Sequence, residues 1–447
     1  MARVLAVDVG TSSLRAELFD GEGAPLREIV RRRYEPGPTL DPEPLVASVR
    51  DAITAAGPID AVAYSCLWHS LVALDERDRP VTPVFTWLDR SAAEDAIALA
   101  RELDPVAAHA RTGAPIHPSF WPAQLRRLRR EGVSFARVAA FPDYLRARLH
   151  GGLATTTSIA SGTGLYRVHE LRWDEELVDV LGIDESHVPP VHDDVVMLGD
   201  GAAANVGAGC VTAERACISI GTSGALRVVR SDAESRPGLF LYRLDRDRYV
   251  QGGALSDGGN LLVWLSRHLS TTIGDALDRP PGRVAFLPQL GGERSLGWRP
   301  DATGAISGLT MTTTSEDVVQ AAFEGISYHF RDILDTLAWP SQPSELGQAN
   351  RLSRSESDIR QVVATGTALL ARPGWGQLLA DVLEVPVTFS AVAEASARGA
   401  ALVAIGRTNL PAPLGETFEP RPERFEAHRD ARERLRQLYE ATTAPTS

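Results

Sequence analysis

A turn of small polar residues between two strand-like runs, in residues 3–19, constrains the fold more than any other feature of the chain. The first run, VLAV, ends at Asp8, and the second run, LRAELF, alternates apolar and polar residues. The turn offers hydroxyl and backbone N–H donors from Gly10, Thr11, Ser12 and Ser13. This pattern predicts a β-hairpin. Because such donors can surround phosphate oxygens while the Asp8 carboxylate reaches an accompanying cation, the hairpin is a candidate phosphate loop.

A second copy of this arrangement opens the other half of the chain. Residues 217–229, CISIGTSGALRVV, repeat the strand-turn-strand pattern around Gly221 and Thr222. One Gly-Thr-Ser hairpin is also a common structural turn, but two of them predict a duplicated architecture with one phosphate loop in each domain. The arrangement resembles the superfamily of actin, hexokinase and the heat-shock chaperone ATPases, whose members use paired phosphate hairpins and hold a nucleotide in the cleft between two domains.

Chain length, net charge and the lack of lysine exclude several classes of protein. A chain of 447 residues exceeds the size at which one hydrophobic core stops growing, so two domains are expected. The formal net charge of -12 disfavours a nucleic acid or an anionic membrane as partner. The sequence contains no lysine, which excludes both a P-loop NTPase and a Schiff-base enzyme. Phosphate must therefore be handled by backbone groups, hydroxyls, arginine and a metal ion.

Cysteine content and the lack of long apolar runs indicate a cytoplasmic protein. The three cysteines, Cys66, Cys210 and Cys217, are too few and too scattered for a disulfide framework or a zinc site. The sequence enters a strand at once, without the charged and then apolar pattern of a secretory leader. No apolar run approaches the length of a membrane span. We therefore expect no membrane partner.

A third chemically rich stretch, residues 197–209, reads MLGDGAAANVGAG. Glycines flank Asp200 ahead of an alanine-rich segment, which lets a helix N-terminus and a carboxylate approach a ligand closely. The structural alternative is a tight turn in which Asp200 is only the N-cap of the helix. The functional interpretation is favoured because the second phosphate hairpin follows immediately.

Alternating strand and helix patterns along the rest of the chain predict an α/β layer structure. Residues 59–65 read as a buried strand, and residues 252–265 as a loop that leads into a helix. The polar residues 341–357 are expected to form an exposed loop. The periodicity typical of helices appears in residues 45–56, 92–102, 122–130, 317–337, 375–383, 395–405 and 430–439.

The order of these motifs resembles the FGGY carbohydrate kinases from end to end, and in particular their gluconate-kinase-like branch. The matching pieces include DVGTSSLRAELFD, WHSLVALD, PVFTWLDR, RTGAPIHPSFWPAQL, LGDGAAANVGAGC, SIGTSGALR, GAISGLT and EASARGAALVA. The resemblance implies two ribonuclease-H-like domains of the actin/hexokinase type, with the active site in the cleft between them. The expected domains are residues 1–208, which bind the sugar and catalyse, and residues 209–447, which bind the nucleotide.

The resemblance also implies roles for individual residues. Asp200 matches the catalytic base, and Asp8 matches the carboxylate that holds Mg²⁺ through water. The residues that match the ATP-binding positions are Gly10, Thr11, Ser12, Ser13, Gly221, Thr222, Gly308 and Gly366. The residues in sugar-contacting segments are Trp68, His69, Trp87 and Asp89, and Asp200 lies against the acceptor hydroxyl.

Two motifs depart from the family pattern. The segment WLDRS is one residue shorter than the usual tryptophan-any-aspartate-threonine-arginine motif, which leaves the role of Arg90 open. The motif on the adenosine side usually carries two or three consecutive glycines, whereas this chain has Ala364, Thr365, Gly366 and Thr367. This difference is expected to alter nucleotide affinity.

The implied reaction is phosphoryl transfer from ATP to a hydroxyl of an open-chain sugar acid, and gluconate is the expected substrate. The gluconate carboxylate requires a cation or several donors, for which His69, Arg90 and His117 are candidates. The aromatic residues Trp68, Trp87, Phe120 and Trp121 can stack on a sugar or fill the core. A kinase for xylulose, ribulose or glycerol is the first alternative, and a non-catalytic sugar or nucleotide sensor is the second. Whether the chain forms a homodimer stays open.

Overall fold

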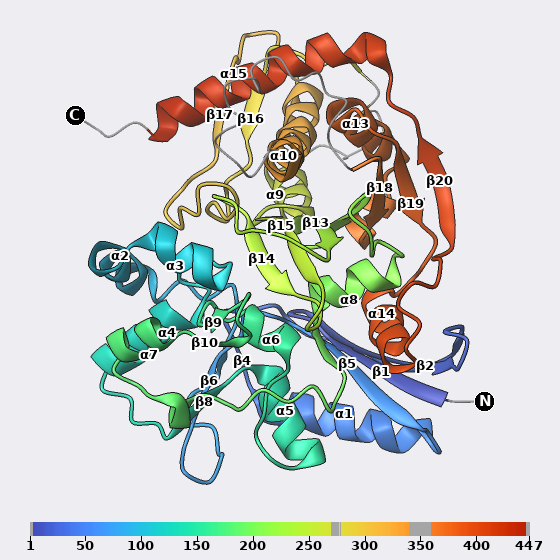
Figure 1. The fold of residues 1–447 in the computed structure, drawn as a ribbon. Coiled ribbons are helices and arrows are strands. Elements are labelled where there is room, and N and C mark those ends of the chain that lie inside the picture. The colour runs from blue at the N-terminus through green and yellow to red at the C-terminus, as the bar shows by residue number, and fades with distance from the viewer. Residues whose placement is uncertain (1–2, 270–276, 278, 339–358, 444–447) are drawn as a thin grey trace. The chain divides into compact units, whose positions relative to one another are not determined.

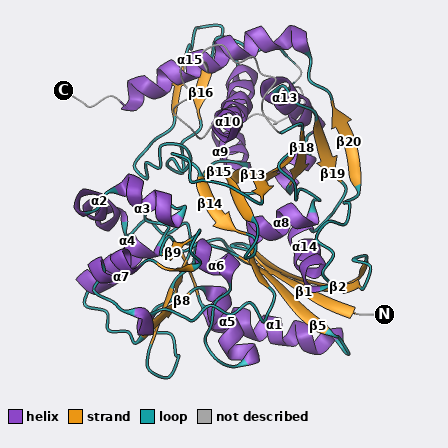
Figure 2. Ribbon diagram, viewed as in Figure 1, coloured by secondary structure: helices purple, strands orange, loops and turns teal. Residues whose placement is uncertain are grey.

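The computed structural model describes residues 3–269, 277, 279–338 and 359–443, in which helices and strands alternate (Figures 1 and 2). The chain forms two compact units. Unit 1 comprises Met1–Val211, Val229–Gln251 and Val392–Ala412, and unit 2 comprises Thr212–Val228, Gly252–Ala391 and Pro413–Ser447. The contiguous division into residues 1–208 and 209–447 stays a prediction. The polar stretch 341–357 lies outside the described residues.

Unit 1 is built on a five-stranded sheet of order β11-β5-β1-β2-β3. The strands of unit 1, inside and outside this sheet, are β1 Arg3–Val9, β2 Ser13–Asp20, β3 Pro25–Arg33, β4 Thr39–Leu40, β5 Ala61–Cys66, β6 Val72–Leu74, β7 Val84–Phe85, β8 Arg137–Ala139, β9 Tyr166–Arg167, β10 Arg172–Trp173, β11 Met197–Gly199 and β14 Phe240–Arg243. Its helices are α1 Pro42–Ala56, α2 Ala93–Glu102, α3 Pro105–Thr112, α4 Trp121–Arg130, α5 Phe141–His150, α6 Thr157–Ser161, α7 Glu175–Val180, η1 Glu185–His187, α8 Asp200–Gly207 and α14 Ala395–Ala404.

A second sheet has seven strands in the order β14-β15-β13-β12-β18-β19-β20, of which β12, β18, β19 and β20 lie wholly in unit 2. The strands not yet named are β12 Arg215–Ile220, β13 Gly224–Arg230, β15 Tyr249–Leu255, β16 Ala285–Leu287, β17 Ala305–Ser307, β18 Gln361–Thr365, β19 Val387–Ser390 and β20 Leu414–Phe418. The helices of unit 2 are α9 Gly259–His268, α10 Ser315–Ala338, α12 Thr367–Leu370, α13 Pro373–Leu383, η4 Pro422–Arg424 and α15 Phe425–Thr443.

The two sheets share one pattern of strand pairing, which confirms the predicted duplication. In the first sheet β1 is antiparallel to β2 and parallel to β5, and β5 is parallel to β11. In the second sheet β12 is antiparallel to β13 and parallel to β18, and β18 is parallel to β19. Each predicted phosphate hairpin therefore lies at the centre of a mixed sheet, and each is followed by two parallel neighbours.

Helix α14, which covers most of the predicted helix 395–405, packs closely against helix α8 through small residues. A Cβ atom at Gly207 would lie 1.7 Å from the carbonyl oxygen of Ala395, and one at Gly399 would lie 1.8 Å from that of Ala203. The buried Arg398 donates from Nη1 to the Gly207 oxygen, 2.7 Å away, at the C-terminal end of α8. The alanines of α14 also pack on β1, β2 and β5. Helix α8, which begins at Asp200, is therefore held firmly on the first sheet (Figure 1).

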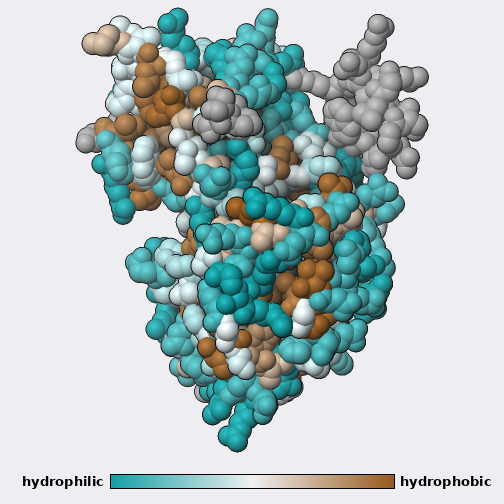
Figure 3. Space-filling view, turned by 90° about the vertical axis from the view of Figure 1, so that its left-hand side faces the viewer, coloured by the Kyte–Doolittle hydropathy of each residue, from teal (hydrophilic) through white to brown (hydrophobic). Residues whose placement is uncertain are grey.

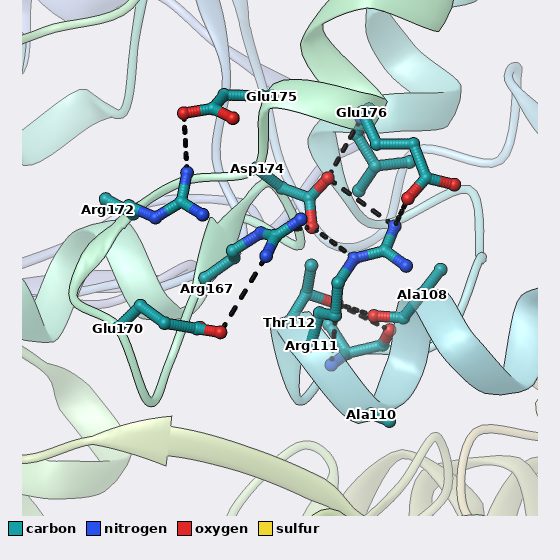
Figure 4. A network of polar contacts seen from close by, with 12 residues as sticks. Ala108, Ala110, Arg111, Thr112, Arg167, Glu170, Arg172, Asp174, Glu175 and Glu176 are labelled. Atoms are coloured by element: carbon teal, nitrogen blue, oxygen red, sulfur yellow. Dashed lines mark hydrogen bonds and ion pairs between the residues drawn. The ribbon is translucent and has the colours of Figure 1, made fainter.

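A buried carboxylate, Asp174, ties three elements of unit 1 together (Figure 4). Its Oδ2 lies 2.6 Å from Nε of Arg111 on α3 and 3.1 Å from Nε of Arg167 on β9. Its Oδ1 accepts a hydrogen bond from Leu177 N, 3.0 Å away, and so caps α7. If one of these elements moved away, the buried Asp174 carboxylate would lose a partner and be left with an uncompensated charge. The network therefore fixes the arrangement of α3, α7 and the β9–β10 hairpin.

The structure corrects the expectation of a loop at the start of residues 252–265. This part belongs to β15, which runs from Tyr249 to Leu255, and helix α9 begins only at Gly259. Glycines inside a strand mark places where another group comes close. A Cβ at Gly252 would lie 2.1 Å from the Leu226 oxygen, and one at Gly253 would lie 2.6 Å from the side chain of Ile333.

The buried Asp143 on α5 predicts a pH dependence of stability. Its side chain is 0% exposed, and burial raises its pKa to about 7, against the hydrogen bond that its Oδ2 accepts from Ala140 N. The folded state thus holds a proton that the unfolded state releases near pH 4, so stability falls as the pH rises toward 7. We expect Asp143 to contribute a loss of about 2 to 3 kcal/mol between pH 5 and pH 8.

The variant Asp143→Asn keeps an acceptor for Ala140 N and cannot titrate. Urea unfolding of both proteins from pH 5 to pH 8 checks this expectation, because the wild type should lose stability relative to the variant as the pH rises. Parallel stability profiles would show that Asp143 does not hold the proton.

The surface is mostly hydrophilic on the face seen in Figure 3, with smaller apolar areas between the polar ones. Exposed apolar side chains such as Leu309 and Met311 follow β17 in unit 2. Scattered exposed apolar side chains are normal on folded proteins. Among the described residues, no helix combines the length and the apolar character needed to span a bilayer.

Candidate active site

The parallel strands of unit 1 bring three of the predicted site segments to one edge of the first sheet. β1, β5 and β11 are parallel, so their carboxyl ends lie at the same edge, where ligands bind in open α/β sheets. Asp8 lies near the end of β1, Trp68 and His69 follow β5, and Asp200 follows β11. The topology therefore gathers residues that are up to 192 positions apart in the sequence.

Asp8 is held by its cross-strand neighbours on both sides. The register pairs Asp8 with Ser65 on β5 and with Arg15 on β2. The Ser65 hydroxyl donates to Oδ1 of Asp8 at 2.7 Å, and Nη1 of Arg15 lies 3.4 Å from Oδ2. Because side chains directly opposite each other on paired strands interact, the pairing of β1 with β2 and with β5 dictates these contacts.

The electrostatic environment favours a cation beside Asp8. Burial raises its pKa to about 6, against the hydrogen bond from Ser65 and the charge of Arg15, and the carboxylates of Asp200 and Glu394 raise it further. A buried carboxylate close to two others carries an uncompensated negative charge when ionised. Burial, with Asp8 and Asp200 nearby, also raises the pKa of the Cys66 thiol.

Asp200 is the first residue of α8, and Gly199 is the N-cap. Asp200 is therefore not the N-cap of this helix, and its functional role stays a prediction. Its Oδ1 accepts a hydrogen bond from Gly201 N at 2.8 Å, and the side chain is only partly buried. The positive end of the helix dipole stabilises its ionised form. Asp200 thus presents a carboxylate at the same edge as Asp8.

Two aromatic residues, Tyr34 and Trp87, hold the turn of the first predicted phosphate hairpin by hydrogen bonds. Gly10 N donates to Ser13 O at 2.9 Å and closes the turn. Tyr34, just after β3, donates its hydroxyl to Gly10 O and its N–H to Ser12 O. Nε1 of Trp87 donates to the hydroxyl of Thr11 at 3.0 Å. Since that hydroxyl acts as an acceptor here, its own proton is available for a phosphate oxygen.

Trp68 packs directly on the backbone that leads into Asp200. A Cβ at Gly199 would lie 2.0 Å from the indole ring, and one at Gly162 would lie 2.4 Å from it. The indole Nε1 donates to Ser158 O at 2.8 Å, and the side chain is 5% exposed. Trp68 therefore positions the start of α8 and offers little ring surface for stacking.

His69 lies beside Trp68 in an aromatic cluster. Its Nδ1 is 3.0 Å from Gly162 O, so this nitrogen carries a proton and donates it. Its Nε2 is 3.5 Å from the Tyr242 hydroxyl, and the ring meets Phe120 and Tyr242 edge to face. His117 is also buried, and its Nδ1 accepts from Ser119 N at 3.2 Å.

Asp89 is fully engaged by protein groups. Oδ1 accepts from the backbone and the hydroxyl of Ser91, and Oδ2 accepts from Gln124 and from Nη1 of Arg127 at 2.9 Å. Both members of the Asp89–Arg127 pair are buried. This network orients the loop that carries Trp87. Arg90, whose role the sequence left open, is exposed.

In unit 2 the second predicted phosphate hairpin lies close to Gly366. β12 and β18 are parallel, and the turn after each strand lies at the same edge. A Cβ at Gly366 would lie 2.4 Å from Ile220 O, and one at Gly259 would lie 2.5 Å from Gly221 O. Gly366 also has a φ of 93°, which favours glycine. Thr222 O accepts from the backbone N–H of Asn260 at 3.1 Å.

Gly221, Gly259 and Gly366 thus form a glycine cradle, in which backbone without side chains lines the turn of the second hairpin. In the motif of residues 364–367, only Gly366 has to be glycine for this close approach. A Cβ at Gly221 would meet nothing within 4 Å, so this position is open to a ligand. Within the motif of residues 364–367, Gly366 occupies the position that lies against the backbone of Ile220. Gly308 is placed elsewhere in unit 2, at the end of β17, and its nearest neighbours are Arg283 and Val284.

The donor set fits a magnesium ion that keeps most of its waters. Within the described ranges, no group of three or more His, Cys, Asp or Glu side chains could hold a metal ion. Magnesium in nucleotide sites usually binds one or two carboxylates together with phosphate oxygens and water. Asp8 and Asp200 supply such a pair of carboxylates at one sheet edge.

Several residues around the site were missed at the sequence level. Ser65 and Arg15 are readable in principle, because strand pairing places them opposite Asp8 once the sheet order is known. Tyr34 stands at the end of the third strand and has no motif of its own. Glu394, which contacts Arg15, comes from a segment more than 370 residues later and has no local signal.

Comparison with known proteins assigns the family. The N-terminal domain of the FGGY family of carbohydrate kinases matches residues 3–203, and the C-terminal domain matches residues 216–406. The chain is 27% identical to a gluconokinase of Bacillus subtilis over 91% of this chain and 87% of that protein. It is 29% identical to a glycerol kinase of Allorhizobium ampelinum over 97% and 96%, respectively.

The fold agrees with this assignment. The structure of a xylulose kinase from Lactobacillus acidophilus superimposes with a TM-score of 0.87 at 23% identity, covering 100% of this chain and 99% of that one. The paired sheets and the order of the motifs lead to the same result. The chain belongs to the FGGY family of carbohydrate kinases and has the two-domain, actin- and hexokinase-like fold of that family.

Proposed function

We propose that this sugar kinase transfers the γ-phosphate of ATP to a hydroxyl of gluconate or a closely related open-chain sugar acid. The observation that carries the transfer chemistry is the pair of carboxylates, Asp8 and Asp200, at one edge of the first sheet. The glycine cradle of unit 2 supports nucleotide binding, because bare backbone can approach a ligand closely. The likeness to a gluconokinase supports the substrate class.

In the proposed reaction Asp200 lies against the acceptor hydroxyl and orients it. The hydroxyl oxygen forms a bond to the γ-phosphorus, the bond to the ADP oxygen breaks, and the proton of the hydroxyl passes to Asp200 and later to solvent. A carboxylate is a weak base for an alcohol, so this proton moves late, when the bond to phosphorus is well advanced. The products are ADP and the phosphorylated sugar acid.

Asp8 would hold the magnesium ion of the nucleotide, and this ion would supply charge neutralisation for the phosphate oxygens. The turn of Gly10 to Ser13 offers the Thr11 hydroxyl and backbone N–H groups to the same oxygens. Phosphoryl transfer passes through a loose transition state that needs alignment and electrostatic stabilisation more than covalent help. The turn of Gly10 to Ser13, which Tyr34 and Trp87 hold in place by hydrogen bonds, would provide this alignment.

A panel of acceptors tests the substrate directly. ADP release with purified protein should be faster with gluconate, or a close aldonate, than with xylulose, ribulose or glycerol at matched concentrations. A buried carboxylate needs a cation or several donors, whereas a neutral polyol does not. A preference for a neutral acceptor would remove the sugar-acid assignment and leave the kinase assignment standing.

His69 is the proposed carboxylate contact, through Nε2. A charge-assisted hydrogen bond is worth roughly 1.5 to 3 kcal/mol, and an arriving carboxylate favours the protonated ring. His69→Ala should therefore lower kcat/KM for gluconate about ten- to a hundredfold more than kcat/KM for xylulose. Tyr242→Phe, which removes the hydroxyl next to Nε2 and keeps the ring packing, is the control. Equal losses on both substrates would mean that His69 contacts a shared hydroxyl or only packs.

The second candidate is a kinase for a ketose or polyol. The observation in its favour is that proteins named glycerol kinase and xylulose kinase match this chain over nearly its whole length. The acceptor panel separates the two candidates. A sensor without catalysis is disfavoured, because it would have no use for the carboxylate pair.

A further inference from the structure

A chain of ion pairs leads away from Asp8 to a residue from the far end of the sequence. Nη1 of Arg15 lies 3.4 Å from Oδ2 of Asp8 and 3.0 Å from Oε2 of Glu394. Oε1 of Glu394 lies 2.7 Å from Nη2 of Arg31, which also pairs with Glu28. Glu394 is the residue just before α14, and the segment that carries it belongs to unit 1.

Arg15 is shared unequally between its two carboxylates. Nη1 of Arg15 donates a hydrogen bond to Oδ2 of Asp8 at 3.4 Å, which is long against the about 2.7 to 2.9 Å of a charge-assisted bond, whereas its shorter contact with Oε2 of Glu394, at 3.0 Å, is an ion pair. An arginine next to one carboxylate prefers a close, two-pronged pair. Nε of Arg15 is buried and has no hydrogen-bond partner in the part of the chain that the structure describes, so Arg15 would gain a bond by turning onto Asp8.

Glu394 is well placed to hold Arg15 back. Its side chain is 14% exposed and is fixed on its other oxygen by Arg31. Its carboxylate makes no capping hydrogen bond to α14, so its side chain serves the ion pairs rather than the helix. The charge of Glu394 also acts on Glu17 on β2. Burial raises the pKa of Glu17, and the charge of Glu394 raises it further. Several carboxylates thus compete for Arg15 and Arg31, and the charge of Arg15 is divided between Asp8 and Glu394.

We propose that Glu394 is a positioning residue that holds Arg15 away from a close ion pair with Asp8 and so keeps Asp8 available to the metal ion of the metal–nucleotide complex. The inference rests on the proposed role of Asp8. Without the Glu394 charge, Arg15 closes onto Asp8 and competes with the metal ion for its carboxylate.

Binding of Mn²⁺ to the full-length protein with saturating ADP, followed by electron paramagnetic resonance, tests the inference without turnover. Glu394→Gln keeps the shape of the side chain and should weaken Mn²⁺ binding about tenfold. Arg31→Gln is the matched control, because it removes the other arginine that pairs with Glu394. Glu394 can then still pair with Arg15, so Mn²⁺ binding should not weaken. Removing Arg15 as well, in Arg15→Gln/Glu394→Gln, should restore the affinity to within about threefold of wild type.

This rescue distinguishes positioning from structural damage, because a misfolded site would not recover when a second side chain is removed. Unchanged Mn²⁺ affinity in Glu394→Gln, or no recovery in the double variant, would overturn the inference. If Glu394→Gln does not fold, Glu394→Asp, which keeps the charge but shortens its reach, should weaken Mn²⁺ binding in the same direction, and unchanged affinity there would equally overturn it.

Asp8→Asn separates the inference from the proposed function on which it rests. This variant should lose most of its Mn²⁺ affinity in the ADP complex. If it does not, the metal role of Asp8 is wrong and the inference falls with it. If it does while Glu394→Gln binds Mn²⁺ like the wild type, only the role of Glu394 is wrong.

Discussion

Replacing Asp200 with asparagine is expected to lower kcat by at least two orders of magnitude and to leave ADP affinity within a few-fold of wild type. The amide keeps the shape of the side chain at the start of α8, but it cannot accept the proton of the acceptor hydroxyl. The loss of a group that acts in the transition state costs about 3 to 6 kcal/mol. Steady-state kinetics and calorimetric titration with ADP measure the two quantities.

A matched control for this variant is Asp179→Asn, which removes a carboxylate from an exposed position on α7 in the same unit. Its turnover should equal that of the wild type. If Asp200→Asn kept near-normal turnover, Asp200 would not be the base, and the carboxylate at the start of α8 would have a role only in metal or substrate binding.

Replacing Asp8 with asparagine should raise the Mg²⁺ concentration needed for half-maximal activity by about tenfold or more. Turnover should also fall about a hundredfold at saturating ATP, because the charge that neutralises the metal ion is lost where the phosphates bind. The buried Ser65 hydroxyl can still donate to the amide oxygen at this position, so the strand pairing should survive. A Mg²⁺ titration of activity at saturating ATP measures both effects.

The matching control is Ser65→Ala, which removes only the hydrogen bond to Oδ1 of Asp8 and should shift the Mg²⁺ requirement much less than Asp8→Asn does. An unchanged titration in Asp8→Asn would leave Asp8 with a structural role alone.

Local patterns in the sequence were enough to predict the strands and turns that carry the site. The alternation around Asp8 and Gly10 predicted the first hairpin, and its repeat at Gly221 predicted the second, because a hairpin is formed by neighbours in sequence. The periodicity of residues 395–405 predicted a helix, and the structure packs this helix, α14, on α8. The helical start at Asp200 was also readable from the glycines beside it.

Contacts between distant segments could not be predicted in this way. The Asp89 carboxylate is occupied by Gln124 and Arg127 from α4, which periodicity cannot reveal. Glu394 reaches Arg15 only because α14 packs on the first sheet. The glycines at 252 and 253 suggested a loop, although they belong to a strand that approaches its neighbours closely. In each case tertiary packing, which a local pattern does not contain, decided the outcome.

Phosphorus NMR of the complete reaction tests the central claim most directly. Wild-type protein, incubated with ATP, Mg²⁺ and gluconate, should form one phosphomonoester of the sugar acid for each ADP released, and Asp200→Asn should form this ester at least about a hundredfold more slowly at the same enzyme concentration. Release of ADP with inorganic phosphate alone, or an ester from xylulose or glycerol but not from gluconate, would contradict the account.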